Sequence, residues 1–210
     1  MTIKPFDLDD LRHQLATSLD SIAELNNDKW VAQIRPEEWG EILRRATEGL
    51  KCQIAECSRA PASVLEMLAR DSDNSVRKSV AWHPNTPASV LEKLAKDSHY
   101  SVREAVAQNP STPASVLEML ARDSVRGLVA LHPSTPASVL EKLARDADSG
   151  VRYTVARNPR TPASVLEKLA LDSDIDVREA VARNLSTPAS VLMKLALGKV
   201  GKVIAMLLKR

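Results

Sequence analysis

Aspartate and arginine recur as pairs along this chain, and such pairs can serve two kinds of chemistry. In most cases the aspartate stands six residues before the arginine, as with Asp97 and Arg103. A carboxylate beside a guanidinium could take part in proton transfer, or it could form a bidentate ion pair that only holds structure. Because the pairs recur at regular intervals, we interpret them as a structural ladder. Its predicted members are Asp71, Arg77, Asp97, Arg103, Asp123, Arg126, Asp146, Arg152, Asp172 and Arg178.

Cysteine and histidine are the other side chains here that could hold a metal. The chain has two cysteines, Cys52 and Cys57, and their spacing places them roughly 140° apart around a helix, on different faces. His83 and His132 are about two repeats apart, too far to ligate one ion. We therefore predict no metal site and no cofactor, with the cysteines as free structural residues. The alternative is a cluster that these two weak candidate ligands bridge between two chains.

Motifs of catalysis are not found in the sequence. It has no glycine-rich phosphate loop, no His-Glu-x-x-His and no serine–histidine–aspartate constellation, so we predict a non-enzymatic protein. The net charge is only +2, which disfavours nucleic-acid binding driven by overall charge. No apolar run approaches the ~18 residues of a membrane span, and residues 1–10 do not resemble a signal peptide. We expect a cytoplasmic location.

A ten-residue string organises the chain and must position these side chains. Thr-Pro-Ala-Ser-Val-Leu-Glu-Lys-Leu-Ala occurs at Thr86–Ala95, Thr135–Ala144 and Thr161–Ala170, and near-copies begin at Ala60, Thr112 and Thr187. The prolines within these strings are separated by 26, 26, 23, 26 and 26 residues. A fixed period of this size predicts an all-α solenoid, in which each repeat contacts its neighbours.

Each repeat is predicted to form two short antiparallel helices. In the repeat that begins at Thr86, the threonine is the expected N-cap and Pro87 the first helical residue of a helix of about ten residues. A polar break follows, then a second, shorter helix that is partly 3₁₀ and ends at Asn109-Pro110. The repeat that begins at Thr112 lacks three residues, which we expect to shorten the loop between its helices.

About seven such repeats account for most of the chain. We assign residues 1–35 to a region with an N-terminal capping helix, 36–60 to a degenerate first repeat, 61–197 to regular repeats and 198–210 to an apolar capping helix. The terminal caps are expected because an end repeat has an apolar face without a neighbour. The alternative for residues 198–210 is an interface that forms a homodimer.

The repeated residues resemble those of a known family. Thr-Pro-Ala-Ser-Val-Leu-Glu-Lys-Leu-Ala-Arg-Asp, followed by Val-Arg-x-x-Val-Ala-x-Asn-Pro, is similar to the repeats of the leucine-rich repeat variant family, and the Asp-to-Arg spacing is similar to HEAT repeats. The resemblance implies a right-handed superhelix of paired helices without a sheet. Some members carry an N-terminal iron–sulfur cluster, which the usual four thiolates hold, whereas this chain has two cysteines.

Two positions of the second helix, four residues apart, differ from repeat to repeat. Residues i and i+4 share a helix face, so these positions predict a strip that binds a protein or peptide. The predicted binding residues are Lys78, Trp82, Glu104, Gln108, Leu131, Tyr153, Arg157, Glu179 and Arg183. A solvated face without a partner is the structural alternative. The functional alternative is nucleic-acid binding by a basic C-terminal end, formed by Arg157, Arg160, Arg183, Lys199, Lys202, Lys209 and Arg210.

Overall fold

A computed structural model describes residues 34 and 36–197, and within them all regular structure is α-helical. By contacts the chain divides into two compact units, Met1–Ser111 and Thr112–Arg210. The described helices of the first unit are α3 (Pro36–Arg45), α4 (Glu48–Glu56), α5 (Ala62–Leu68), α6 (Asn74–Trp82), α7 (Ala88–Leu94) and α8 (Tyr100–Gln108). Those of the second are α9 (Ala114–Leu120), α10 (Arg126–Leu131), α11 (Ala137–Leu143), α12 (Ser149–Arg157), α13 (Ala163–Leu169), α14 (Ile175–Arg183) and α15 (Ala189–Leu197).

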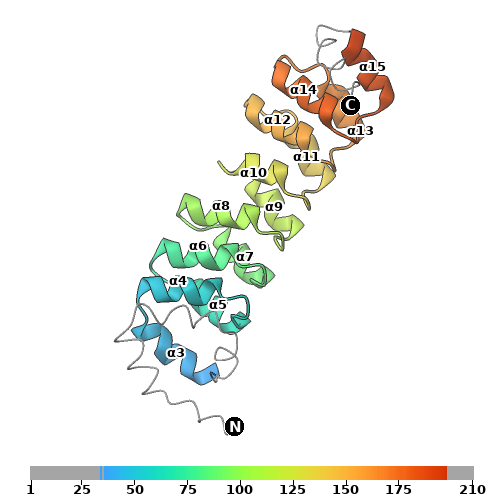
Figure 1. The fold of residues 1–210 in the computed structure, drawn as a ribbon. Coiled ribbons are helices and arrows are strands. Elements are labelled where there is room, and N and C mark those ends of the chain that lie inside the picture. Colours follow the sequence, from blue (N-terminus) through green and yellow to red (C-terminus); the bar gives the residue numbers. More distant parts are fainter. Residues whose placement is uncertain (1–33, 35, 198–210) are drawn as a thin grey trace, which may run out of the picture. The chain divides into compact units, whose positions relative to one another are not determined.

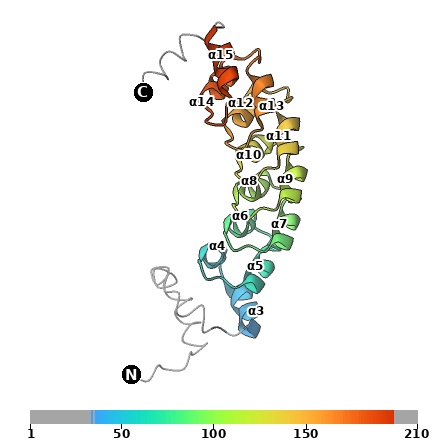
Figure 2. The same cartoon turned by 90° about the vertical axis from the view of Figure 1, so that its right-hand side faces the viewer.

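Within each unit, the second helices of successive repeats pack side by side (Figure 1). The second helices of successive repeats are α4, α6 and α8 in the first unit and α10, α12 and α14 in the second, and each packs closely on the next. The first helices of successive repeats approach each other less closely and pack mainly on second helices. Figure 2 shows α4, α6 and α8 on one side of the first unit, with α5 and α7 on the other.

Small aliphatic side chains form the core because the same positions turn inward in each repeat. On α12, Val151, Val155 and Ala156 are buried. On α13, the buried residues Val165, Leu166 and Leu169 come from the ten-residue string. The all-α helical-repeat fold predicted from the period is confirmed. In the first unit, Trp39 of α3 and Leu50 of α4 are also buried. The predicted terminal caps lie outside the described residues.

The relative lengths of the two helices were predicted wrongly. Most first helices that begin with the string have seven residues, such as Ala88–Leu94, whereas most second helices have nine, such as Tyr100–Gln108. The second helices are α-helical throughout, without a 3₁₀ portion. Three of them begin at an aspartate of the polar break that caps the helix. The carboxylates of Asp73, Asp148 and Asp174 each accept a backbone N–H from the first turn.

The threonine before each proline was also misassigned. Pro87 itself is the N-cap residue of α7, and Thr86 lies buried before it. The Thr86 hydroxyl donates to the Val80 carbonyl at 2.5 Å, so it satisfies the end of the preceding helix. The same bond joins Thr161 to the Val155 carbonyl at 2.5 Å. Threonine therefore links the two helices on either side of it.

The three-residue deletion shortens a helix rather than only a loop. Helix α10 has six residues, against nine in α12, and no side chain caps its N-terminus. The turn before it is closed by the Arg126 N–H, which donates to the Asp123 carbonyl at 3.1 Å. With only Ser124 and Val125 between these residues, no room is left for the first turn of the helix.

Candidate functional site

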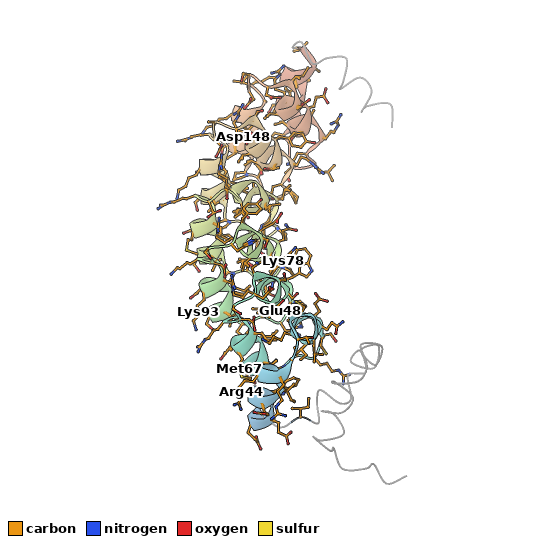
Figure 3. The ribbon with its side chains drawn as sticks, turned by 90° about the vertical axis from the view of Figure 1, so that its left-hand side faces the viewer. Arg44, Glu48, Met67, Lys78, Lys93 and Asp148 are labelled. Carbon is orange, nitrogen blue, oxygen red and sulfur yellow. The ribbon has the colours of Figure 1, made fainter. Side chains whose placement is uncertain are left out.

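The variable face consists of the two positions, four residues apart, that differ between second helices. In the first unit it comprises Lys78, Trp82, Glu104 and Gln108, and in the second Gly127, Leu131, Tyr153, Arg157, Glu179 and Arg183. None of these residues is buried. Trp82 is 55% exposed and Leu131 44%, although large apolar side chains normally turn inward. In Figure 3, Lys78 of α6 lies on the side of the first unit opposite to Lys93 of α7.

Helix α4 adds two residues to the variable face of the first unit. Cys52 and Glu56 stand 26 residues before Lys78 and Trp82, so they occupy the same helical positions. The Ser79 hydroxyl donates to the Glu56 carboxylate at 3.0 Å, which joins α6 to α4. Sequence reasoning omitted these residues because it compared only the regular repeats. The constant offset of 26 residues is the signal that identifies them.

In the second unit, residues of the variable face contact each other in pairs, and both members of each pair belong to one helix. The Arg157 guanidinium lies 5.7 Å from the centroid of the Tyr153 ring, a cation–π contact on α12. On α14, Arg183 Nη2 lies 3.0 Å from Glu179 Oε2. Both pairs are one helical turn apart. Two of the arginines assigned to a basic end are therefore engaged here, and another, Arg160, donates to the Pro133 carbonyl at 3.1 Å.

A hollow of about 420 Å³ opens between α12 and α14 on this face. It is lined by Ser149, Gly150, Tyr153, Asp174, Asp176, Glu179 and Arg183. The pKa of Asp174 is lowered, first by a hydrogen bond from Ser149 across the two helices and then by the Asp176 N–H. Asp174 is thus a fixed anion at one wall, while Tyr153 supplies an aromatic surface.

The predicted ladder residues bond both between repeats and within them. Arg152 of α12 bonds to Asp172, twenty residues later, with Nε–Oδ2 at 2.7 Å and Nη2–Oδ1 at 2.9 Å. Its Nη1 donates to the backbone carbonyl of Asp146, its partner at a spacing of six, at 2.8 Å. One guanidinium therefore closes its own interhelix turn and holds the next. Equivalent ion pairs are Lys51–Asp71, Arg77–Asp97 and Arg126–Asp146.

The remaining ladder residues bond to backbone groups close in sequence. Arg103 Nη1 donates to the Asp97 carbonyl at 2.8 Å, and Arg178 Nη1 donates to the Asp172 carbonyl at 2.5 Å. Asp123 Oδ1 accepts the Val125 N–H at 3.2 Å. Sequence reasoning missed Lys51, which occupies the arginine position in the first repeat.

The guanidinium groups set the ionisation of the ladder carboxylates. A hydrogen bond from Arg152 is the main cause that lowers the pKa of Asp172, and Arg126 acts in the same way on Asp146. At Asp97, burial is the largest influence and raises the pKa, but Arg77 and the His99 N–H outweigh it, so the pKa is lowered. These carboxylates are held as anions, which suits structural ion pairs better than proton transfer.

Asparagines at the ends of second helices form another set of contacts between repeats. Asn158 is buried, and its Nδ2 donates to the Ala130 and His132 carbonyls at 2.8 and 3.1 Å. Its Oδ1 accepts the Arg160 N–H at 2.8 Å. Asn109 and Asn184 bond in the same way within their units. Each side chain satisfies carbonyls at the end of the preceding repeat's second helix.

Histidine replaces asparagine at two of these positions. Nδ1 of the buried His83 accepts the Asn85 N–H at 3.1 Å, so the ring hydrogen is on Nε2, which lies 3.0 Å from the Cys57 carbonyl. His132 is also buried, and its Nδ1 accepts the Ser134 N–H at 3.1 Å. Both nitrogens of His83 are therefore occupied by backbone groups, which leaves none for a metal.

The cysteines do not fit a four-thiolate cluster. Cys57 is buried at the end of α4 and Cys52 is half-buried on the variable face. Burial is the main cause that raises the pKa of the Cys52 thiol, which favours the protonated form rather than the thiolate that binds metal. Among the described residues there is no group of three potential metal-binding side chains. None of the described helices combines the length and the apolar character of a membrane span.

The repeats and the fold are similar to those of known proteins. The family model described as leucine rich repeat variant matches residues 100–124, 125–148 and 150–174. A solved structure described as a leucine-rich repeat variant with a novel repetitive protein structural motif is 27% identical, with a TM-score of 0.63. The similarity covers 94% of this chain and 82% of that one. No curated protein matches the chain. Residues 100–174 are thus similar to the leucine rich repeat variant model, and the helical-repeat frame is similar to that solved structure.

Proposed function

We propose that this chain is a cytoplasmic, non-enzymatic scaffold that binds another protein or peptide on its variable face. The observation that carries the proposal is a contrast within each second helix. Residues that bond to the next repeat recur, whereas the exposed residues beside them change from repeat to repeat. Helical-repeat frames of this kind are used for extended binding surfaces.

The composition of the face supports a protein partner. Trp82 and Tyr153 are aromatic, and Arg157 and Arg183 carry guanidinium groups, the types most often found as anchors in protein interfaces. The exposed arginines are paired with Tyr153 and Glu179, so they do not form an uninterrupted basic stripe. A stripe of that kind is what phosphate backbones require.

A pull-down from a lysate of the source cell tests the proposal for each unit by itself. Wild type is compared with Trp82→Ala and with Tyr153→Ala, and each eluate is assayed for protein and nucleic acid. Glu92→Ala and Glu167→Ala are the matched controls, because these glutamates are exposed on first helices.

We expect a stoichiometric protein that either or both aromatic variants lose and that both controls retain. A protein bound equally by all variants would show that the variable face is not the binding surface. Nuclease-sensitive nucleic acid that binds steeply less with rising salt would favour the nucleic-acid alternative instead.

A further inference from the structure

The hollow between α12 and α14 gives the variable face of the second unit a definite chemistry. Three of its lining residues are acidic, Asp174, Asp176 and Glu179, and one is basic, Arg183. Arg183 is already paired with Glu179 at 3.0 Å. Asp176 is exposed and makes no ion pair within the described part of the chain. The hollow therefore presents a net negative wall to solvent.

This charge is local to the second unit. The positions on α8 that correspond to Asp174, Asp176, Glu179 and Arg183 hold His99, Ser101, Glu104 and Gln108. The same frame there carries one carboxylate instead of three. Asp174 also caps α14, so the acidity of the hollow that does not serve the helix frame comes from Asp176 and Glu179.

An aromatic wall completes the hollow. Tyr153 lines it, whereas Arg157, which lies over the same ring at 5.7 Å, does not. The contact shows that this tyrosine accepts a guanidinium within its own helix, and the negative face of an aromatic ring attracts cations. Carboxylates and a tyrosine together form a surface complementary to a long cationic side chain, whose methylenes pack on the ring while its charge meets the acids.

We propose that the hollow receives an arginine or lysine side chain from an extended, basic segment of a partner protein. This inference rests on the proposed function and names the chemistry of the partner for the second unit. The volume of about 420 Å³ admits one long side chain rather than a folded element. Because the hollow is negative, the partner's segment is expected to carry positive charge. Tyr153 provides the apolar contact for the side chain of that segment.

The test uses the full chain and synthetic peptides. The probe is a fluorescein-labelled glycine–serine peptide that carries three arginines, and the comparison peptides carry three citrullines or three glutamates. Citrulline keeps the shape of arginine but lacks its charge. Binding is measured by fluorescence anisotropy for wild type, for Asp176→Asn/Glu179→Gln and for the control Glu141→Gln/Glu167→Gln. The control removes the same charge from exposed residues of α11 and α13.

We expect the arginine peptide to bind wild type and the control equally, and the hollow variant at least tenfold more weakly. The citrulline and glutamate peptides should bind wild type no better than they bind the hollow variant. Circular dichroism and the melting temperature of each variant show that its fold is retained, and Asp176→Asn alone replaces the double variant if the latter unfolds.

Equal loss in the control variant would overturn the proposal, because it would reveal attraction by overall charge alone. Preference for the glutamate peptide, or no binding of the arginine peptide, would also overturn it. Neither result decides the proposed function. A pull-down partner that Trp82→Ala or Tyr153→Ala loses would still establish the scaffold, with different partner chemistry.

Discussion

Neighbouring residues of α12 differ in the contacts they make. Arg152 bonds to Asp172 of the next repeat, whereas Tyr153 contacts Arg157 in its own helix and lines an open hollow. The same contrast separates Asn158, which bonds to the preceding repeat, from Arg157 beside it. Most residues that join repeats recur with the period, and most that do not join them vary. Glu56 of the variable face, which bonds to Ser79, is an exception. Under the proposed function, stability and recognition therefore depend on different positions of one helix.

The strongest test of this division removes the arginine. Arg152→Ala should lower the free energy of unfolding by about 3 kcal/mol, because Asp172 and the Asp146 carbonyl both lose a charged donor. The side chains of Arg152 and Asp172 are only 15% and 7% exposed, so water replaces these bonds poorly. Urea denaturation followed by circular dichroism measures the change.

Tyr153→Ala is the control for this variant. It should shift the urea midpoint little, by about 0.5 kcal/mol or less, because the ring is on the exposed side of the helix. Similar losses for the two variants would mean that the variable face also holds the repeats together, and the division would fail.

A smaller effect is expected at the end of the same helix. Asn158→Ala should cost about 1 to 2 kcal/mol, because it leaves the buried carbonyls of Ala130 and His132 without their donor. Asn158→His should recover part of this loss, since histidine fills the equivalent position at His83 and donates there to one carbonyl. The urea midpoints of both variants measure these changes in stability. Arg157→Ala, at the neighbouring residue of the variable face, is the control. No difference between alanine and histidine would contradict the donor role.

The smallest predicted effect concerns acid. Arg152 lowers the pKa of Asp172, so the Asp172 carboxylate binds a proton less readily in the folded chain than in the unfolded chain. In the unfolded chain, aspartates titrate at about pH 4. The stabilisation is therefore complete above about pH 4 and is lost as the pH falls through the lower folded pKa. Wild type should lose stability more steeply than Asp172→Asn in this range. Parallel pH profiles of the urea midpoint would refute the linkage.

The fold was predictable because it depends on a pattern that repeats many times. The period of 26 residues and the buried valines and leucines specify paired helices, whichever repeat is inspected. Local signals were less reliable. Threonine before proline is the ordinary sign of an N-cap, yet the acceptor of the Thr86 hydroxyl is Val80, at the end of the preceding helix. A rule that considers only the residues that follow cannot identify that acceptor.

The ladder and the site show the same limit. The ladder prediction allowed bonds within and between repeats, and the carboxylate that Arg152 binds lies in the next repeat, at Asp172. Sequence distance cannot reveal which repeat a side chain faces, because both aspartates are equivalent in the pattern. The hollow was not predicted either. It depends on how α12 and α14 lie against each other, which the exposed residues do not determine.

The recurrence of the same donors and acceptors also bears on how such a gene changes length. Thr135–Ala144 and Thr161–Ala170 are identical and begin 26 residues apart, so an insertion or deletion of 26 residues between them would keep the pattern. The new junction again pairs an arginine with an aspartate twenty residues later and an asparagine with the carbonyls before it. Buried polar groups stay matched after such an event. The array can therefore gain or lose a position of the variable face in one step without a compensating mutation.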